Sequence, residues 1–310
     1  MKYLVVGFGN IGRRRARLLG ERCVATVDPA SPDASRRSTA DVPAPAYDAV
    51  VLATPNQSKL EYLERFLAQG KSVLVEKPLL FSSRAQAEAV AGRARGGAIW
   101  YTSYNHRFEP LIRRLKERLD EGAVGKVDRA RMLYGNGTVR DWVGSWRESG
   151  GGVLEDLGCH LLDLCGYLLD HEEERYVLWD LRSVESGTWD YGLFASADRR
   201  AVCEVGNVFW KNTFQIDVYG SAGSLHLDGL GKWGGATLAY RTRVLPSGVP
   251  PETREESPAG DATWEADLAE FERRVAAREF SLDNDWRISA ALASLLSQAP
   301  GAGARGGPAA

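Results

Sequence analysis

The densest cluster of reactive side chains lies within residues 150–163, just after a run of three glycines. Asp156, His160 and Asp163 are spaced i, i+4 and i+7, which places them on one face of a helix. Because Val153 and several leucines surround them, we expect this helix to be largely buried, and a buried imidazole among carboxylates needs partners. Of the four histidines only His160 has this company, so it is the best candidate for a general base.

Two other interpretations fit the same spacing. In the first, His160 is a core histidine that pairs with Asp163. In the second, Asp156, His160 and Asp163 together ligate a metal ion. No further cluster of histidine or cysteine accompanies these residues, so we expect no metal site.

A glycine motif follows the first apolar run of the chain. Gly7, Gly9 and Gly12 form the pattern G-x-G-x-x-G between a predicted strand and a predicted helix. The first glycine permits a tight turn, the second lets the backbone approach a pyrophosphate, and the third lets the helix pack on the strand. The residues expected to hold the phosphates of a dinucleotide at the helix N-terminus are Gly7, Gly9, Asn10, Ile11 and Gly12.

Asp28 closes the second predicted strand, 28 − 7 = 21 residues after Gly7. A carboxylate at this place accepts hydrogen bonds from the adenosine ribose and repels a 2′-phosphate, which favours NAD over NADP. Arg36 and Arg37 in the next loop offer a partner for that phosphate, so NADP stays possible. We expect NAD as the cofactor.

Two further motifs follow strands of the same predicted sheet. Thr54, Pro55 and Asn56 come after one strand, and Glu76 and Lys77 end another. Open parallel sheets bind ligands at the carboxyl ends of their strands, so we expect all five residues to line the cofactor site. A lysine there can donate to a substrate oxygen, although a lysine before a proline is also typical of a solvated turn.

The elements that must position these residues divide the chain in two. Strands predicted at 3–6, 23–27, 48–53, 72–75 and 98–102 alternate with helices at 11–19, 59–69 and 84–95. This alternation predicts a doubly wound parallel sheet, a Rossmann domain over residues 1–105. Strands at 127–134, 176–184, 191–197, 201–208, 214–219 and 237–244 follow one another through short turns, which favours antiparallel pairing. Helices at 110–121, 152–169, 264–278 and 286–298 complete an α+β domain over 106–298, and 299–310 is expected to be disordered.

Candidate substrate contacts lie at the boundary between the two predicted domains and beyond it. Asn105 and Arg107 sit at the join, and Trp146 precedes the three glycines. Tryptophan faces commonly cover sugar rings, and an arginine gives a cleft the positive character that suits a phosphorylated, carboxylated or nucleotide-linked substrate. Aromatic packing accounts for the stretch at the join equally well.

Composition excludes several classes of protein. The chain has 310 residues, and its 39 Lys and Arg against 41 Asp and Glu give a net charge of −2, so we expect no nucleic-acid partner. No run approaches the length of a membrane-spanning helix, so we expect no membrane partner. The four cysteines form no Cys-x-x-Cys pair, and we expect a cytoplasmic protein.

Together these motifs resemble the Gfo/Idh/MocA family, named after glucose–fructose oxidoreductase, inositol dehydrogenase and a rhizopine-catabolism protein. The likeness extends to about residue 298. It rests on the glycine motif, on Glu76-Lys77-Pro78, on the stretch that starts at Asn105, and on Trp146-Arg147 leading to Asp156 and His160. The resemblance implies a Rossmann domain followed by an α+β domain whose large, mostly antiparallel sheet joins chains into homodimers or homotetramers.

The resemblance also implies site residues and an activity. The family's catalytic lysine corresponds to Lys77, its substrate-facing aspartate and catalytic histidine to Asp156 and His160, and a frequent family acid to Asp163. The implied enzyme is an NAD-dependent oxidoreductase that transfers a hydride between nicotinamide and a hydroxyl or keto carbon of a cyclic polyol, sugar or nucleotide-linked sugar. Two alternatives are an NAD-dependent glycosidase that oxidises its sugar transiently, and an inactive dinucleotide-binding regulator. Lys77, Asp156 and His160 argue against the regulator, which needs only a cofactor pocket.

Overall fold

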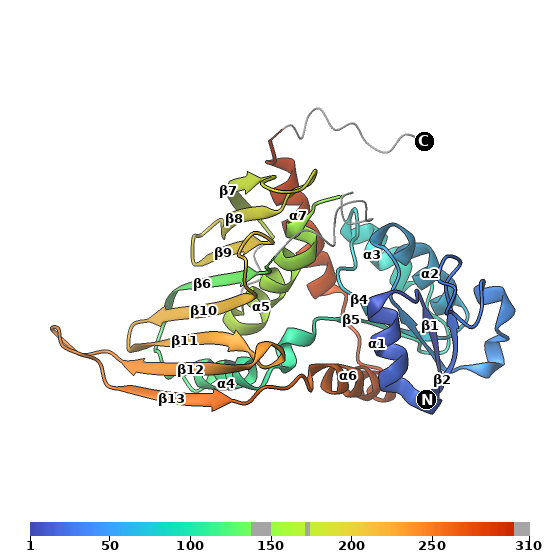
Figure 1. The fold of residues 1–310 in the computed structure, drawn as a ribbon, viewed down its shortest axis with the longest axis horizontal. Helices are drawn as coiled ribbons and strands as arrows, with labels where there is room; N and C mark the ends of the chain where they lie inside the picture. The colour runs from blue at the N-terminus through green and yellow to red at the C-terminus, as the bar shows by residue number, and fades with distance from the viewer. Residues whose placement is uncertain (138–149, 171–173, 301–310) are drawn as a thin grey trace. The chain divides into compact units, whose positions relative to one another are not determined.

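The computed structural model describes residues 1–137, 150–170 and 174–300, and the chain divides into two compact units (Figure 1). The first unit comprises Met1–Asn105 and Trp264–Ser289. The second comprises His106–Thr263 and the chain from Ala290 onward. Of the tail expected to be disordered, residues 301–310 lie outside the described residues.

The first unit has a five-stranded, all-parallel sheet in the order β2-β1-β3-β4-β5, which confirms the predicted doubly wound domain. Its strands are β1 (Tyr3–Val6), β2 (Cys23–Val27), β3 (Ala49–Leu52), β4 (Ser72–Glu76) and β5 (Trp100–Ser103). Its helices are α1 (Asn10–Leu19), α2 (Asn56–Ala68), α3 (Arg84–Ala91), α6 (Thr263–Ala277) and the start of α7 (Asp283–Ser297). α2 begins three residues earlier than predicted, because Pro55 stands at its N-cap position.

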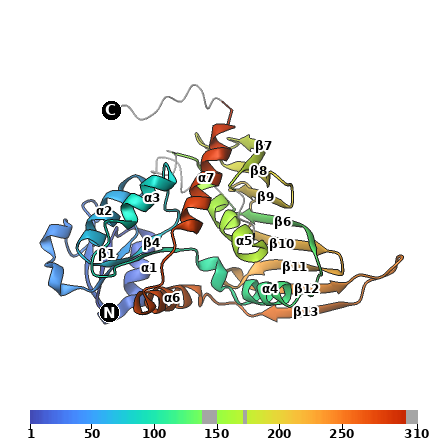
Figure 2. The ribbon, with the colours of Figure 1, turned by 180° about the vertical axis from the view of Figure 1, so that it is seen from behind.

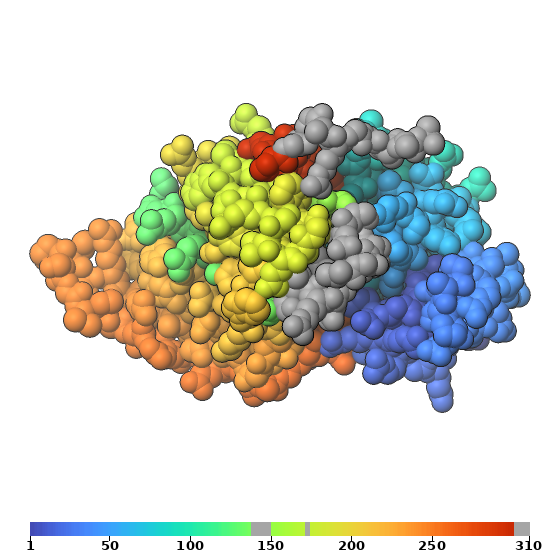
Figure 3. All heavy atoms as spheres, turned by 45° about the horizontal axis from the view of Figure 1, so that its top comes forward, coloured from blue at the N-terminus to red at the C-terminus, as the bar shows by residue number. Residues whose placement is uncertain are grey.

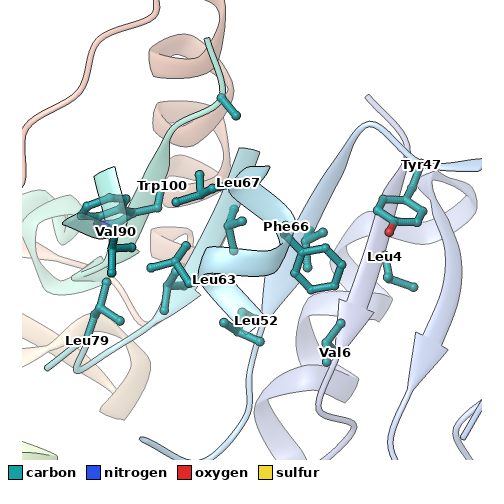
Figure 4. Packing of buried hydrophobic residues seen from close by; sticks show 14 of the residues in the cluster. Leu4, Val6, Tyr47, Leu52, Leu63, Phe66, Leu67, Leu79, Val90 and Trp100 are labelled. Atoms are coloured by element: carbon teal, nitrogen blue, oxygen red, sulfur yellow. The ribbon is translucent and has the colours of Figure 1, made fainter. Parts of the chain in front are cut away.

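Helices cover both faces of this sheet, which explains why the central strands β1 and β3 are apolar and buried throughout. On one face the buried residues of β1 and β3, Leu4, Val6 and Leu52, pack with Leu63 and Phe66 of α2 (Figure 4). On the other face, odd-numbered residues of the same strands pack against α1 and α6. Each strand therefore has a core on both sides.

The returning segment Trp264–Ser289 was expected in the second domain, but it packs in the first unit. Asp285 accepts hydrogen bonds from Trp100 Nε1 at 2.8 Å and Thr102 Oγ1 at 3.0 Å. Asp267 accepts one from the Tyr101 hydroxyl at 3.0 Å. Two carboxylates thus fasten α6 and the start of α7 to β5, a long-range link that helical periodicity does not reveal.

The second unit is built on an eight-stranded sheet in the order β13-β12-β11-β10-β6-β9-β8-β7. Among the strand pairs that the structure describes in this sheet, β6–β9 alone is parallel. Its strands are β6 (Val127–Gly135), β7 (Tyr176–Arg182), β8 (Tyr191–Ser196), β9 (Ala201–Gly206), β10 (Thr213–Gly220), β11 (Gly223–Leu230), β12 (Gly235–Thr242) and β13 (Glu252–Ser257). This sheet confirms the expected α+β half of the fold. Strand β11 and the edge strand β13 were not predicted; four of the six residues of β13 are charged, which suits an exposed edge and gives no apolar pattern.

Helices α4 (Pro110–Asp120) and α5 (Cys159–Leu169) lie on one face of the eight-stranded sheet (Figures 1 and 2). Buried and partly exposed residues alternate along β10, where Phe214, Ile216 and Val218 face the helices. No described helix covers the opposite face, which therefore presents the polar side chains of these strands. The connection between β12 and β13, in orange, extends beyond the strands beside it (Figures 1 and 3).

Within the described residues, no helix combines the length and the apolar character needed to cross a membrane.

Candidate active site

The glycine motif forms the turn between β1 and α1. Gly7 has φ +88°, and a Cβ there would collide with the Ala53 carbonyl, so no other residue fits. A Cβ on Gly12 would collide with the Gly7 carbonyl, whereas one on Gly9 would meet nothing within 4 Å. The loop is thus packed against β3 at Gly7 and open at Gly9. With no acidic residue in the first turn of α1, its free N–H groups and positive dipole end suit the phosphates of a dinucleotide.

Asp28 is tied to this loop by hydrogen bonds. Its carboxylate accepts from the backbone N–H groups of Phe8 at 2.8 Å, Ala30 at 2.8 Å and Ser31 at 2.9 Å. Burial opposes its ionisation, but these three donors outweigh burial and hold the pKa of Asp28 below its ordinary value. Asp28 is therefore a fixed negative charge beside the glycine turn.

The ends of β3 and β4 are joined by a lysine that the sequence reasoning overlooked. Lys59 of α2 is 2% exposed, and its ammonium donates to Asn56 Oδ1 at 2.8 Å. The same ammonium donates to the carbonyls of Glu76 at 2.6 Å, Lys77 at 3.2 Å and Pro78 at 2.7 Å. Lys59 thus fixes the backbone from which the Lys77 side chain projects. Thr54, Pro55 and Asn56 lie in the turn between β3 and α2.

A second overlooked residue holds the side chain of Glu76. Arg15 of α1, 1% exposed, donates to Glu76 at 2.7 Å, to Asp267 at 2.6 Å and to Ser103 at 2.6 Å. Burial raises the pKa of Asp267, which shares one guanidinium with a second carboxylate. Glu76, expected to bind the cofactor, thus has its Oε1 atom in contact with Arg15.

In the second unit, the helix that carries Asp156 and His160 does not begin as a regular α-helix. A π-helical turn, η6 (Leu154–Gly158), precedes α5 and contains Asp156. Gly152, at φ +56°, opens it, and a Cβ there would collide with the Trp189 carbonyl. A π turn takes one residue more than an α turn, so the regular spacing expected for Asp156 and His160 does not hold there. Such turns occur frequently at functional sites.

The core-histidine interpretation paired Asp163 with His160, and the structure shows Asp163 paired with Arg107. Arg107, which follows His106 in the short helix η4 (Asn105–Phe108), donates to both carboxylate oxygens of Asp163, at 2.8 and 2.5 Å. Asp163 is 1% exposed, so this bidentate pair is a buried link between η4 and α5. Arg107 was expected to contact substrate; its guanidinium is engaged by Asp163.

His160 lies among aromatic rings. It is 5% exposed, and its ring centroid is 4.1 Å from that of His106 and 5.7 Å from that of Tyr134. Burial, followed by the nearby Asp156 carboxylate, raises the pKa of the Tyr134 hydroxyl above its ordinary value. Asp156 and His160 are therefore both close to Tyr134, although the sequence reasoning assigned no role to Tyr134.

The remaining predicted residues are placed as follows. Lys77 and Asn105 belong to the first unit, and Asp156 and His160 to the second. Trp146 lies outside the described residues. Within the described ranges, no group of three or more His, Cys, Asp or Glu side chains is arranged to hold a metal ion.

Comparison with known proteins gives two family matches. Residues 1–100 match the model of an oxidoreductase family with an NAD-binding Rossmann fold, and residues 112–226 match a GFO/IDH/MocA C-terminal domain.

Similar proteins include dehydrogenases of inositol. An inositol 2-dehydrogenase of Rhizobium meliloti is 24% identical over 250 residues, which cover 73% of this chain and 74% of that protein. A scyllo-inositol 2-dehydrogenase (NAD(+)) of Bacillus subtilis is 30% identical over 131 residues, covering 41% of this chain and only 37% of that protein. Among solved structures, a 3-ketoreductase from Actinomadura kijaniata in complex with NADP and TDP-benzene has a TM-score of 0.72. The two chains are 20% identical, and the match covers 94% of this chain and 95% of that one. At this identity the likeness supports the fold alone.

Proposed function

This chain belongs to the Gfo/Idh/MocA family of NAD(P)-binding oxidoreductases, and we propose that it transfers a hydride between NAD and a hydroxyl or keto carbon of a cyclic polyol, sugar or nucleotide-linked sugar. The observation that carries the proposal is the setting of His160. It is a buried imidazole on the first turn of α5, directly after the π turn that holds Asp156. A base must be held in one orientation to take a proton from a hydroxyl, and the rings around His160 supply that restraint.

In the proposed oxidation, His160 takes the proton of the substrate hydroxyl. The Lys77 ammonium donates to the reacting oxygen and stabilises the negative charge that develops there. Asp156 accepts a hydrogen bond from a neighbouring substrate hydroxyl and so orients the ring. When bound, the nicotinamide provides the hydride chemistry that protein side chains lack.

The preference for NAD rests on Asp28. Its carboxylate stays ionised because three backbone donors hold it, and it lies beside the glycine turn. A fixed negative charge there accepts ribose hydroxyls and repels a 2′-phosphate. The two candidate partners for that phosphate donate to backbone carbonyls, Arg36 to Ser35 at 2.7 Å and Arg37 to Ser31 at 2.8 Å.

We also propose that the uncovered face of the eight-stranded sheet joins copies of the chain into a homodimer or homotetramer. The β12–β13 connection beside it exposes Leu245 at 68% and Val249 at 93%, apolar surface that a second copy would cover. Light scattering after size exclusion at several micromolar concentrations tests this. A monomer at every concentration would reject it.

The experiment that tests the proposed activity uses purified protein with NAD or NADP and panels of inositols, sugars and nucleotide sugars. Absorbance of the reduced cofactor is read in both directions. We expect turnover with at least one polyol or sugar and with NAD in preference to NADP. Release of an aglycone without net reduced cofactor would instead indicate the glycosidase, and silence across both panels would reject hydride transfer.

A further inference from the structure

Lys232 reaches the ring that packs against His160. It lies in the short helix η7 (Gly231–Trp233), between β11 and β12. Its ammonium is 3.1 Å from Nε2 of His106 and 3.4 Å from the Tyr134 hydroxyl. An ammonium can only donate, so Nε2 of His106 must accept, and the neutral ring then carries its proton on Nδ1. Lys232 thus selects one protonation state and one tautomer of His106.

His106 is itself firmly held. It is 2% exposed, and its ring lies 5.2 Å from Tyr134 and 5.6 Å from Phe214, centroid to centroid. Its ring centroid is 4.1 Å from that of His160, with 33° between the ring planes. The His106 ring therefore packs against the His160 ring and limits the orientations that His160 can take.

Two hydrogen bonds of the neighbouring Gly231 hold the backbone that carries Lys232. The Gly231 N–H donates to the buried Glu109 carboxylate at 3.3 Å, and the Gly231 carbonyl accepts from the Gly260 N–H at 3.0 Å. Burial raises the pKa of Glu109, while the Gly231 donor and the Lys232 charge oppose that rise. η7 is thus held to Glu109 at the start of α4, and Lys232 has little freedom to leave His106.

We propose that Lys232 is a positioning residue, which holds His106 in its neutral Nδ1–H form so that His106 presents an uncharged ring face to His160. The inference rests on the proposed role of His160 as the base. A charged His106 would repel the imidazolium that His160 becomes on taking the substrate proton. A rotated His106 ring would no longer pack against His160 and restrain its orientation. In the second unit, His160 lies near His106 from η4 and Tyr134 from β6, Asp156 of the π turn lies near Tyr134, and Lys232 contacts His106.

The test compares Lys232→Met, which removes the donor, with Lys232→Arg, which keeps it, and with Lys126→Met as a control at an exposed lysine of the same unit. The ¹⁵N spectra of the histidine rings, assigned with His106→Gln, report the tautomer without any substrate. We expect wild type, Lys232→Arg and Lys126→Met to show the Nδ1–H form, and Lys232→Met to lose it. Circular dichroism and the affinity for NAD verify that each variant is folded.

With an active substrate, Lys232→Met should lower kcat roughly 10-fold to 100-fold, as expected for a displaced catalytic group, while KM changes little. Lys232→Arg should recover most of the rate. An unchanged His106 tautomer in Lys232→Met, or an altered tautomer with the turnover of Lys126→Met, would overturn the proposal. If no substrate is found for the wild type, hydride transfer fails, whereas the ¹⁵N spectra still decide whether Lys232 controls His106.

Discussion

The Arg15 guanidinium lies 2.7 Å from the Glu76 carboxylate, which joins the helix after the glycine turn to the strand that ends before Lys77. The same guanidinium contacts Asp267 of α6 at 2.6 Å, and Arg15 and Asp267 are 1% and 0% exposed. One buried cation therefore links α1, β4 and α6.

Arg15→Met should destabilise the protein by about 3–5 kcal/mol, because it leaves two carboxylates buried without their cation. Asp267→Asn should cost less, because the Arg15 guanidinium keeps Glu76 as an anionic partner and the asparagine oxygen can still accept from it. Urea unfolding followed by tryptophan fluorescence measures both. Arg17→Met, at an exposed position of the same helix, is the control, and equal losses for Arg15→Met and Arg17→Met would contradict the prediction.

Asp28→Ala should weaken NAD binding roughly 10-fold or more, the usual effect of losing a hydrogen bond to a charged group, and narrow the gap between NAD and NADP. Titration calorimetry with both cofactors measures the ratio. Asp33→Ala removes a carboxylate from the same loop, where it pairs with Arg13 at 2.7 Å, and should leave the ratio unchanged. An unaltered ratio in Asp28→Ala would mean that Asp28 does not reach the ribose.

Glu270 on α6 should make the protein sensitive to acid. Hydrogen bonds from Arg273 and then Arg274 lower the pKa of Glu270 from 4.5 to about 2. Because the folded-state pKa is the lower one, the carboxylate stabilises the fold above about pH 4.5, and this contribution is lost as the pH falls towards 2.

Glu270→Gln should therefore lower the stability at pH 7 by about 1 kcal/mol, since its partners are partly exposed, and flatten the dependence of stability on pH between 4.5 and 2. Thermal melts across that range measure it. Glu265→Gln, at an exposed position of the same helix, should retain the wild-type slope. Parallel pH curves for Glu270→Gln and wild type would contradict the assignment.

Lys77→Ala should lower kcat by removing the donor that stabilises the reacting oxygen. If Lys77 and His160 act on the same oxygen, the double variant should lose less than the product of the two single losses. Steady-state kinetics of the wild type, both single variants and the double variant measure this. Losses that multiply fully would indicate that the two residues act independently.

The sequence predicted the parts whose signal is local. The glycine motif needs its spacing and little else, and the alternation of apolar strands and short helices identified the parallel sheet. The apolar residues around His160 correctly indicated a buried helix. The π turn at Leu154–Gly158 was not predictable, since it follows Gly152, whose close packing against the Trp189 carbonyl is a tertiary contact.

Buried charges were the main omission, because a charged residue in a helix ordinarily faces solvent and only tertiary contacts reveal the exceptions. Two of these residues left a trace. Gly12, Arg15 and Leu19 share the buried face of α1 at spacing i, i+3 and i+7, so the phase of this helix pointed to Arg15. In the same way, Lys59 shares the buried face of α2 with Leu63 and Phe66 at spacing i, i+4 and i+7. Lys232 left no such trace, since His106 and Tyr134, which it contacts, lie 98 or more residues away in the chain.

The turnover of His160→Asn tests the central claim most directly. The substitution should lower kcat by about 10²–10⁴-fold, the usual contribution of a positioned base. The affinity for NAD should stay within about twofold, because the glycine turn and Asp28 belong to the other unit. A folded His160→Asn protein that binds NAD and turns over at nearly the wild-type rate would contradict the claim.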